Sequence, residues 1–288
     1  MIVVFGIINP IPTLTFTPAN PVVCGENTVI TLNASGDKQQ SFLINENFEG
    51  GALGVFTNSN IKSTTEDSKT AWQNKTSTFV PSQQVWFPAI SSGFGPNKFV
   101  MATSDVGSFT IENALISPTV NSTSYLDLTL TLKAFYSRYY IDETAPTLDY
   151  VTLDVSTNSG TSWTEITRYI SDIGIGTRFE NLSFNLNTYI NQPNLKIRIH
   201  YYGEWADGIA IDDVKLFGFT PLSTAFTWSS TSSPVNAFSD AACTIPYSTA
   251  VPTVYIKPTL AQLESGNYSF TANATLSNGC TASQAIGI

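Results

Sequence analysis

The chain has 288 residues, a formal net charge of −9 and only 12% charged side chains. This acidic balance excludes a nucleic-acid-binding protein, because phosphates would be repelled. A hydrophobic content of 42% supports packed cores and excludes a disordered chain.

The length predicts about two domains, at roughly 150 residues each. Thr, Ser and Asn are abundant and aromatic residues reach 12%, a profile typical of secreted all-β proteins. No apolar run approaches the length of a transmembrane helix, so we expect no membrane span.

The first predicted strand is Met1–Ile7, which is almost entirely apolar and precedes a proline-rich break at residues 9–13. Its ending resembles that of the final residues of the chain. We interpret residues 1–12 as the closing strand of a preceding repeat plus a linker. The alternative is a boundary left over from cloning.

Short strands follow in two groups that differ in character. The first group is predicted at Leu14–Thr17 and Thr28–Leu32, and the pattern changes after Asp37. A longer unit then opens with Phe42–Phe48 and continues through further alternating segments. These are Tyr125–Phe135, Val151–Ser156 and Leu182–Leu186.

The longest alternation lies in two segments, Leu195–Tyr202 and Gly208–Gly218, which read as half-buried strands. The link between them carries Gly at each end, which predicts a hairpin. Asp212 and Asp213 interrupt the second strand, where two adjacent carboxylates are unfavourable. A cation or a nearby basic side chain is expected to compensate their charge.

The last part of the chain returns to short strands, predicted at residues 226–230, 254–257, 266–275 and 280–288. Its motifs F-T-W-S-S and N-G-C-T, with N-P-I-P-T and V-V-C-G-E-N-T near the start, resemble the Ig-like or PKD-like repeats of Bacteroidota surface proteins. This resemblance implies a discontinuous Ig-like β-sandwich over residues 13–40 and 219–288. Residues 41–218 would then be a domain inserted into one of its loops, where insertion is tolerated.

The inserted stretch carries four further motifs in order: N-E-N-F-E-G at residue 45, L-I-S-P at 115, V-S-T-N-S-G-T-S-W at 155 and I-D-D-V at 211. The series resembles the cleaved-adhesin and MAM-like domains. That resemblance implies a non-catalytic jelly-roll β-sandwich. The predicted fold class is therefore all-β, an Ig-like sandwich with a jelly roll inserted in one loop.

The resemblances also imply site residues. Glu46 and Glu49 on the opening strand, with Asp212 and Asp213 on the closing strand, are expected to lie together and bind a structural Ca²⁺ through oxygen ligands. The alternative is that these acids face solvent or pair with Lys196 or Arg198.

A disulfide between Cys24 and Cys280 is implied by the repeat motifs around them. Such a bridge typically adds about 2–4 kcal/mol of stability. Cys243 is the odd cysteine and could displace either partner.

Several aromatic residues are candidates for stacking on sugar rings: Trp72, Trp86, Trp205, Tyr139, Tyr140, Tyr201 and Tyr202. Most aromatic residues on sandwich strands are core, and Trp205 in the glycine-flanked link is the best exposed candidate ligand contact. His200 is the single histidine, which gives zinc sites and Ser–His–Asp triads little support. The turn at residues 156–163 resembles a sialidase Asp-box, but a single copy favours a structural turn.

The sequence therefore predicts a non-catalytic structural and adhesive segment, not an enzyme. The resemblance implies an extracellular, repetitive Bacteroidota surface protein exported by the type 9 system, such as a gliding-motility adhesin. Its partners would be neighbouring repeats of the same protein and surface polysaccharide. The alternative is a carbohydrate-binding accessory module of a secreted polysaccharide-degrading enzyme.

Overall fold

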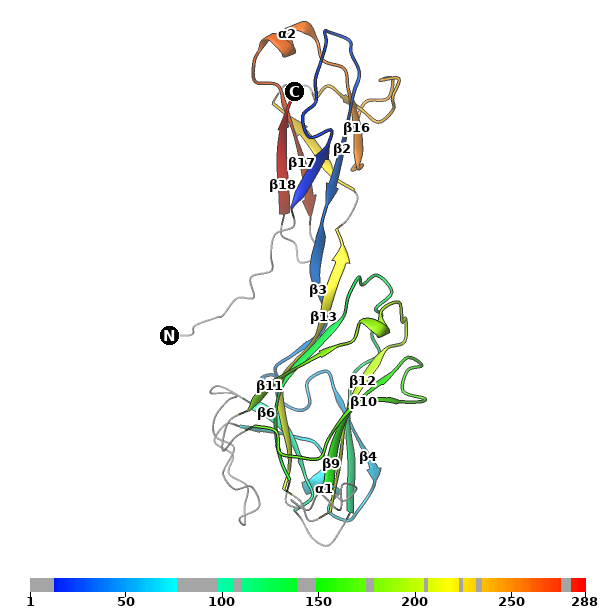
Figure 1. Ribbon diagram of the computed structural model, residues 1–288, viewed down its shortest axis with the longest axis vertical. Coiled ribbons are helices and arrows are strands. Elements are labelled where there is room, and N and C mark those ends of the chain that lie inside the picture. The colour runs from blue at the N-terminus through cyan, green and yellow to red at the C-terminus, as the bar shows by residue number, and fades with distance from the viewer. Residues whose placement is uncertain are drawn as a thin grey trace, which may run out of the picture. The chain divides into compact units, whose positions relative to one another are not determined.

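Antiparallel strands built on period-2 alternation form almost all of the regular structure of the chain (Figure 1). The computed structural model describes residues 13–76, 98–105, 110–138, 149–174, 179–204, 207–222, 225–231, 235–275 and 281–288. Two compact units result: Phe42–Gly218 forms one, and the flanking segments up to Ser41 and from Phe219 to Ile288 form the other.

The flanking unit is a sandwich of two small sheets. The first sheet contains, in order, β1 (Leu14–Thr17), β2 (Ile30–Gly36), β16 (Thr253–Ile256) and β15 (Ala237–Phe238). The second contains β14 (Thr227–Ser230), β17 (Ser269–Thr275) and β18 (Thr281–Gly287). A short helix, α2 (Leu260–Glu264), begins with a capping box at Thr259.

Trp228 anchors the core of this flanking unit. It is buried, its indole nitrogen donates a 2.9 Å hydrogen bond to the carbonyl of Val251, and its backbone N–H is bonded to the hydroxyl of Tyr247. Leu32 from the opposite sheet is completely buried in the same cluster. The tryptophan strand predicted from F-T-W-S-S is thus a core strand.

The inserted unit is a larger sandwich. Its five-stranded sheet has the order β10 (Thr164–Tyr169), β9 (Asp149–Ser156), β12 (Lys196–Glu204), β7 (Thr110–Ile116) and β4 (Thr57–Lys62). Its six-stranded sheet contains β11 (Glu180–Asn185), β8 (Thr129–Ser137), β13 (Gly208–Pro221), β6 (Lys98–Thr103) and β5 (Gln73–Thr76), with β3 (Lys38–Glu46) also pairing with β13. Two short helices, α1 (Asp67–Thr70) and the 3₁₀ turn Asn187–Tyr189, complete it.

The predicted fold class, an all-β chain of Ig-like and jelly-roll sandwiches, is confirmed by these sheets. Two details of the strand prediction are wrong. The long strand expected at Tyr125–Phe135 begins only at Thr129. The hairpin expected from Leu195 to Gly218 does not form, because β12 belongs to the five-stranded sheet and β13 to the six-stranded sheet.

The chain crosses between sheets at this link for a tertiary reason. Alternate residues of both strands, such as Ile199 on β12 and Ile211 on β13, are buried in one common core. Two strands can bury against the same core from opposite sides only if they lie in facing sheets. The glycines that flank the link predict a turn, but they do not indicate which sheet the following strand joins.

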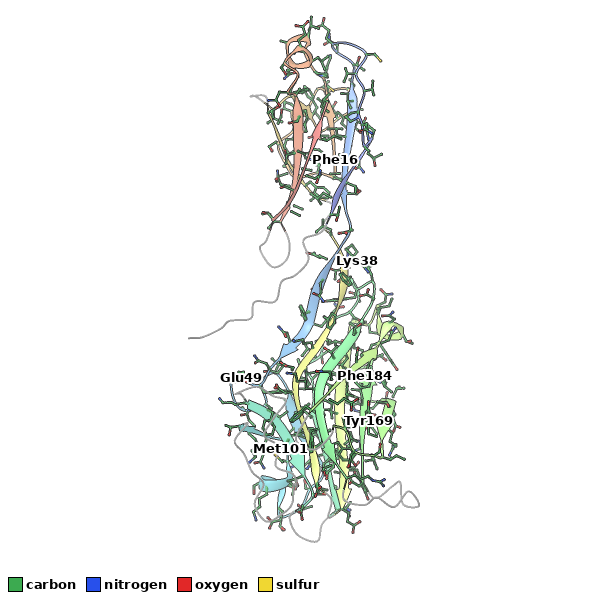
Figure 2. The ribbon with its side chains drawn as sticks, turned by 60° about the vertical axis from the view of Figure 1, so that its left-hand side comes forward. Phe16, Lys38, Glu49, Met101, Tyr169 and Phe184 are labelled. Atoms are coloured by element: carbon green, nitrogen blue, oxygen red, sulfur yellow. The ribbon has the colours of Figure 1, made fainter. Side chains whose placement is uncertain are left out.

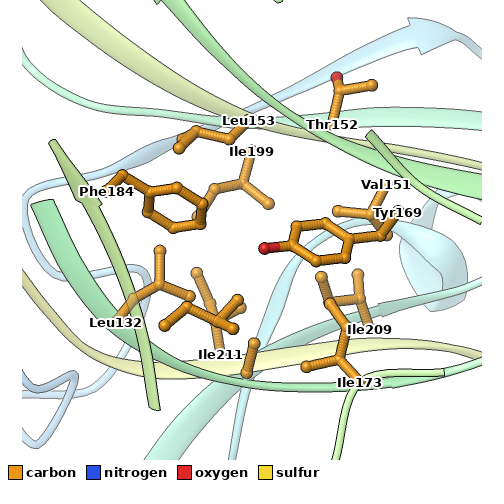
Figure 3. Close-up of a pocket in the computed structure, with 12 residues that line it drawn as sticks. Leu132, Val151, Thr152, Leu153, Tyr169, Ile173, Phe184, Ile199, Ile209 and Ile211 are labelled. Atoms are coloured by element: carbon orange, nitrogen blue, oxygen red, sulfur yellow. The ribbon is translucent and has the colours of Figure 1, made fainter. Parts of the chain in front are cut away.

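A small apolar cavity lies inside this core (Figure 3). Its volume is about 20 Å³, and Tyr169 and Phe184 contribute to its wall from the two sheets. Figure 3 shows the hydroxyl of Tyr169 turned inward between apolar side chains. A space of this size holds about one water molecule at most, so it is a packing defect and too small for a ligand.

Some expectations fall on residues that lie outside the described part of the chain. They are the closing strand at Met1–Ile7, the cysteine at position 280, the ligand contact at Trp205 and the further aromatic candidates Trp86, Tyr139 and Tyr140. Within the described residues, the helices are all too short or too polar to cross a lipid bilayer.

The separate cores predict separable stability effects. Leu32→Ala should destabilise the flanking unit by about 2–5 kcal/mol, because it leaves a cavity at a position with 0% exposure. Denaturant unfolding followed by Trp228 fluorescence would measure the loss. Leu260→Ala, at a leucine that is 50% exposed in the same unit, is the matched control and should change stability by less than about 0.5 kcal/mol. Equal effects of the two substitutions would contradict this core assignment.

Candidate functional site

A β-bulge on β13 accommodates the two adjacent acids that interrupt its alternation. The register of β13 against β8 shifts between Asp212 and Lys215, and Asp213 adopts a left-handed backbone with φ of 49°. Aspartate is among the few non-glycine residues that tolerate this conformation. The Asp213 N–H donates a 2.7 Å hydrogen bond to the Asp212 carboxylate, which links the two acids within the bulge.

The two acids have different surroundings. Asp212 is only 3% exposed, and burial, followed by the nearby charges of Asp213 and Glu49, raises its pKa to about 7. Asp213 forms a 2.7 Å ion pair with Lys133 of β8. The compensating basic residue is therefore Lys133, and not Lys196 or Arg198, which the alternative interpretation named.

Glu46 and Glu49 organise the loop after β3. The two oxygens of Glu46 accept hydrogen bonds from the N–H groups of Phe48 and Val55, at 2.7 and 2.9 Å. Gly54, at a φ of +58°, lies so close that a Cβ there would meet the Glu46 carboxylate at 2.1 Å. Glu49 accepts a 2.9 Å hydrogen bond from the N–H of Lys98.

These contacts leave the predicted Ca²⁺ site only partly assembled. The opening and closing strands do pair, as expected. However, Glu46 closes its own loop and Asp213 is paired with Lys133, which leaves Glu49 and Asp212 as neighbouring carboxylates. Within the described residues, no three acidic, histidine or cysteine side chains are arranged to hold a metal. The four acids are therefore not gathered around one point, and calcium binding stays a prediction.

The predicted disulfide likewise stays a prediction. Cys24 is exposed and is a free thiol in this structure, as is Cys243. The expected partner, Cys280, lies outside the described residues.

The outer face of the five-stranded sheet carries a different and denser cluster. Alternate residues of β9 and β12, such as Val151 and Ile199, point into the core, so their neighbours point away from it. We call this surface the aromatic–ionic face. It is formed by Glu112, Tyr150, Asp154, Trp163, Arg168, Arg198, His200 and Tyr202.

A three-layer stack crosses three strands of this face. The Tyr150 ring of β9 is parallel to the Tyr202 ring of β12, with centroids 5.0 Å apart and an interplanar angle of 3°. On β10, the Arg168 guanidinium lies 4.0 Å from the Tyr150 ring centroid. Arg168 is held in turn by a 2.6 Å ion pair with Glu165. Tyr150 is thus covered on both faces, and Tyr202 is the terminal, half-buried ring of the stack.

An ion pair and a histidine–glutamate hydrogen bond flank the stack. Arg198 pairs with the buried carboxylate of Asp154 at 2.7 Å and lies 4.6 Å from the Trp163 ring centroid. His200 lies 3.0 Å from Glu112 and meets the Tyr150 ring edge-on. Burial lowers the pKa of His200, and Arg198 lowers it further while Glu112 opposes the shift, so the imidazole is neutral at pH 7.

The turn before Trp163 is held by Asn158. Its side-chain oxygen accepts hydrogen bonds from the Ser156 hydroxyl at 2.8 Å and the Ser162 N–H at 2.9 Å. The Asn158 side-chain nitrogen also donates a hydrogen bond to the Ser162 hydroxyl. Both polar atoms of the amide therefore stabilise the turn. The Asp-box-like motif is a structural turn that positions Trp163 over Arg198.

Sequence reasoning found only part of this face. Tyr202 was among the candidate aromatics and is half-buried on the outer face, whereas Trp72 and Tyr201 are core residues. Tyr150 and Arg168 were missed. The alternation of apolar and polar residues indicates which side of its strand each residue occupies. It does not indicate that Tyr150 of β9 lies directly opposite Tyr202 of β12.

No family model and no curated protein matches this chain. Similar solved structures include TmCBM61 bound to β-1,4-galactotriose, with a TM-score of 0.40, 14% identity and coverage of 62% of this chain and 99% of that one. For the K1 cleaved adhesin domain of Lys-gingipain from Porphyromonas gingivalis W83, the TM-score is 0.39 and the identity 14%. The match covers 66% of this chain and 97% of that one. For the CBM22-1 xylan-binding domain of Paenibacillus barcinonensis Xyn10C, the TM-score is 0.34 and the identity 7%. The match covers 64% of this chain and 97% of that one.

The buried carboxylate of Asp212 predicts a pH-dependent stability. Its folded pKa of about 7 lies above the ordinary value of 3.8, so the native state binds more protons between these values. Its contribution to the free energy of unfolding therefore falls as pH rises from about 4 to 7. Asp207, with a pKa raised to about 6, acts in the same direction.

Asp212→Asn should flatten this pH dependence and stabilise the chelated, metal-free protein at pH 8 by about 1–4 kcal/mol. Denaturant unfolding at pH 4 to 8 in chelator measures it. Glu180→Gln, at an exposed glutamate of β11, is the control and should keep the wild-type slope. If the free energy of unfolding of Asp212→Asn changed with pH as steeply as that of the wild type, Asp212 would not be the source of the pH dependence.

Calcium binding has a separate test. If Glu49 and Asp212 share a cation, added Ca²⁺ should raise the melting temperature of the wild-type protein, and chelator should lower it again. Asp212→Asn should lose this response because a neutral amide replaces one carboxylate. A melting temperature that does not respond to Ca²⁺, with no metal detected by elemental analysis, would rule the site out.

Proposed function

We propose that this chain is a non-catalytic adhesive segment of an extracellular protein, and that its inserted jelly-roll unit binds a glycan through the aromatic–ionic face. The observation that carries the proposal is the Arg168–Tyr150–Tyr202 stack with its flanking ion pair and histidine–glutamate hydrogen bond. This surface combines an aromatic ring with many fixed hydrogen-bonding groups, as sugar recognition requires.

The polar groups of this face are already oriented before a ligand arrives. Arg198 is fixed by Asp154 and Trp163, and Arg168 by Glu165 and Tyr150. Fixed side chains lose little conformational entropy on binding, which favours affinity. Because each of these cations has an anionic partner, hydrogen bonding and ring contact suit a hydroxyl-rich ligand better than simple charge attraction does.

The wider assignment rests on the sequence motifs. We infer that the parent is a repetitive surface protein of the Bacteroidota type, in which the Ig-like unit belongs to a row of repeats and displays the jelly roll. A gliding-motility adhesin exported by the type 9 system is the specific form of this inference. The parent polypeptide's complete sequence tests it, since it should contain further repeats.

A second candidate function shares the same binding face. In an accessory module of a secreted polysaccharide-degrading enzyme, the face would hold the enzyme on its substrate. The two functions differ in the rest of the polypeptide, because the enzyme requires a hydrolase domain in the same chain.

Glycan binding can be measured by affinity electrophoresis and calorimetry with xylan, β-1,4-galactan and a panel of bacterial surface polysaccharides. Tyr202→Ala should weaken binding at least tenfold, which corresponds to about 1.4 kcal/mol, because it removes the terminal ring of the stack. Tyr202→Phe retains the ring and should bind with an affinity closer to that of the wild type.

Tyr255→Ala is the matched control, since Tyr255 is also a half-buried strand tyrosine but belongs to β16 of the flanking unit. It should bind normally. The proposal fails if none of the glycans binds, or if Tyr202→Ala and Tyr255→Ala bind as tightly as the wild type while remaining folded by circular dichroism.

A further inference from the structure

The chain passes through the flanking unit twice and through the inserted unit once. It leaves the flanking unit after Ser41, completes the inserted unit from Phe42 to Gly218, and returns at Phe219. The described residues on both sides of the insertion, 13–41 and 219–288, therefore belong to the same folded unit. This arrangement decides which contacts carry a force applied between the ends of the chain.

The outgoing and returning segments are fastened to each other at the insertion point. β3 pairs with β13 (Figure 1), and the carbonyl of Asp37 accepts a hydrogen bond from the N–H of Leu222 at 3.2 Å. The ammonium group of Lys38, labelled in Figure 2, lies 4.1 Å from the Phe219 ring centroid.

Close packing reinforces this fastening. Leu222 is 5% exposed in the core of the flanking unit, and it touches Gly36 so closely that a Cβ at that glycine would meet its Cδ2 at 2.0 Å. Further along the paired strands, the rings of Phe42 and Phe217 have centroids 5.4 Å apart. The two strands are thus joined on both sides of the boundary at Ser41.

Tension entering at one end of the chain can leave at the other through the flanking unit alone. The direct route runs from β1, the first strand of the flanking unit, to β18, the last, through their contact and the core that Leu14 and Ile286 share with Leu32. Residues beyond the β3–β13 pairing form a closed loop of chain and carry no tension while these contacts hold.

We propose that the flanking unit carries tension along the chain and that the paired strands β3 and β13 keep the inserted jelly roll free of it. The aromatic–ionic face then keeps its geometry while the chain is stretched. The shielding of the inserted unit from tension does not depend on which ligand the face binds. A failure of shielding can therefore be told apart from a failure of glycan binding.

Optical-tweezers stretching of the whole chain, with handles attached at its two ends, tests the proposal. The first extension step should come from the flanking unit and release on the order of 400 Å, followed by one on the order of 600 Å from the inserted unit. A single combined step on the order of 1000 Å also supports shielding if its force exceeds that needed to open the inserted unit directly. A first step on the order of 600 Å would overturn the proposal.

The direct force is measured with handles on clickable amino acids placed at Val55 and Ile170, two exposed positions of the inserted unit. This geometry places the jelly roll itself under tension and supplies the comparison for a combined step. A combined step at or below that direct force would overturn the proposal.

Two matched core substitutions give an independent readout. Leu32→Ala in the flanking unit should lower the force of the first step, because forced unfolding follows the barrier of the unit under tension. Leu153→Ala, at a leucine 3% exposed in the core of the inserted unit, should leave that force unchanged. A lower first-step force in Leu153→Ala would show that the inserted unit is under tension and would overturn the proposal.

Discussion

The strand β13 is the element on which the inserted unit depends. It pairs with β6 and β8 and also with β3, so it closes the jelly roll and completes the six-stranded sheet. Ile209 and Ile211 are buried in the core from this strand. One segment therefore makes the pairings that complete this sheet, and a β-bulge accommodates its two adjacent acids.

The two adjacent carboxylates of β13 lie in different electrostatic surroundings. Asp213 pairs with Lys133, whereas burial, with the nearby charges of Asp213 and Glu49, raises the pKa of Asp212 to about 7. A buried carboxylate of this kind destabilises the folded state whenever it is ionised. Calcium binding at Glu49 and Asp212 stays a prediction.

The same period-2 alternation that fills the core also builds the aromatic–ionic face. On β9, Val151 and Leu153 point inward while Tyr150 and Asp154 point outward. Rigid strands hold these outward groups in register with those of β12, which is a more accurate support for a binding surface than a loop. The lone histidine is part of this surface, and its contact with Glu112 explains its place inside a strand.

The sequence alone determined the all-β class, because alternation of apolar and polar residues is a local property of strands. It located Leu14–Thr17 with its observed bounds, the Trp228 core strand and the pairing of the opening and closing strands of the inserted stretch. The jelly-roll and Ig-like character followed from motifs at spacings that the sheets accommodate.

Only the tertiary structure decided which strands face each other. The link after Leu195–Tyr202 has the glycines of a hairpin, yet β12 pairs with β7 and β9 in one sheet and β13 pairs with β6 and β8 in the other. Ion-pair partners such as Lys133 with Asp213, and the Tyr150–Tyr202 stack, depend on the register between strands distant in sequence. Register is set by the packing of the whole sandwich, so no local pattern of residues could reveal it.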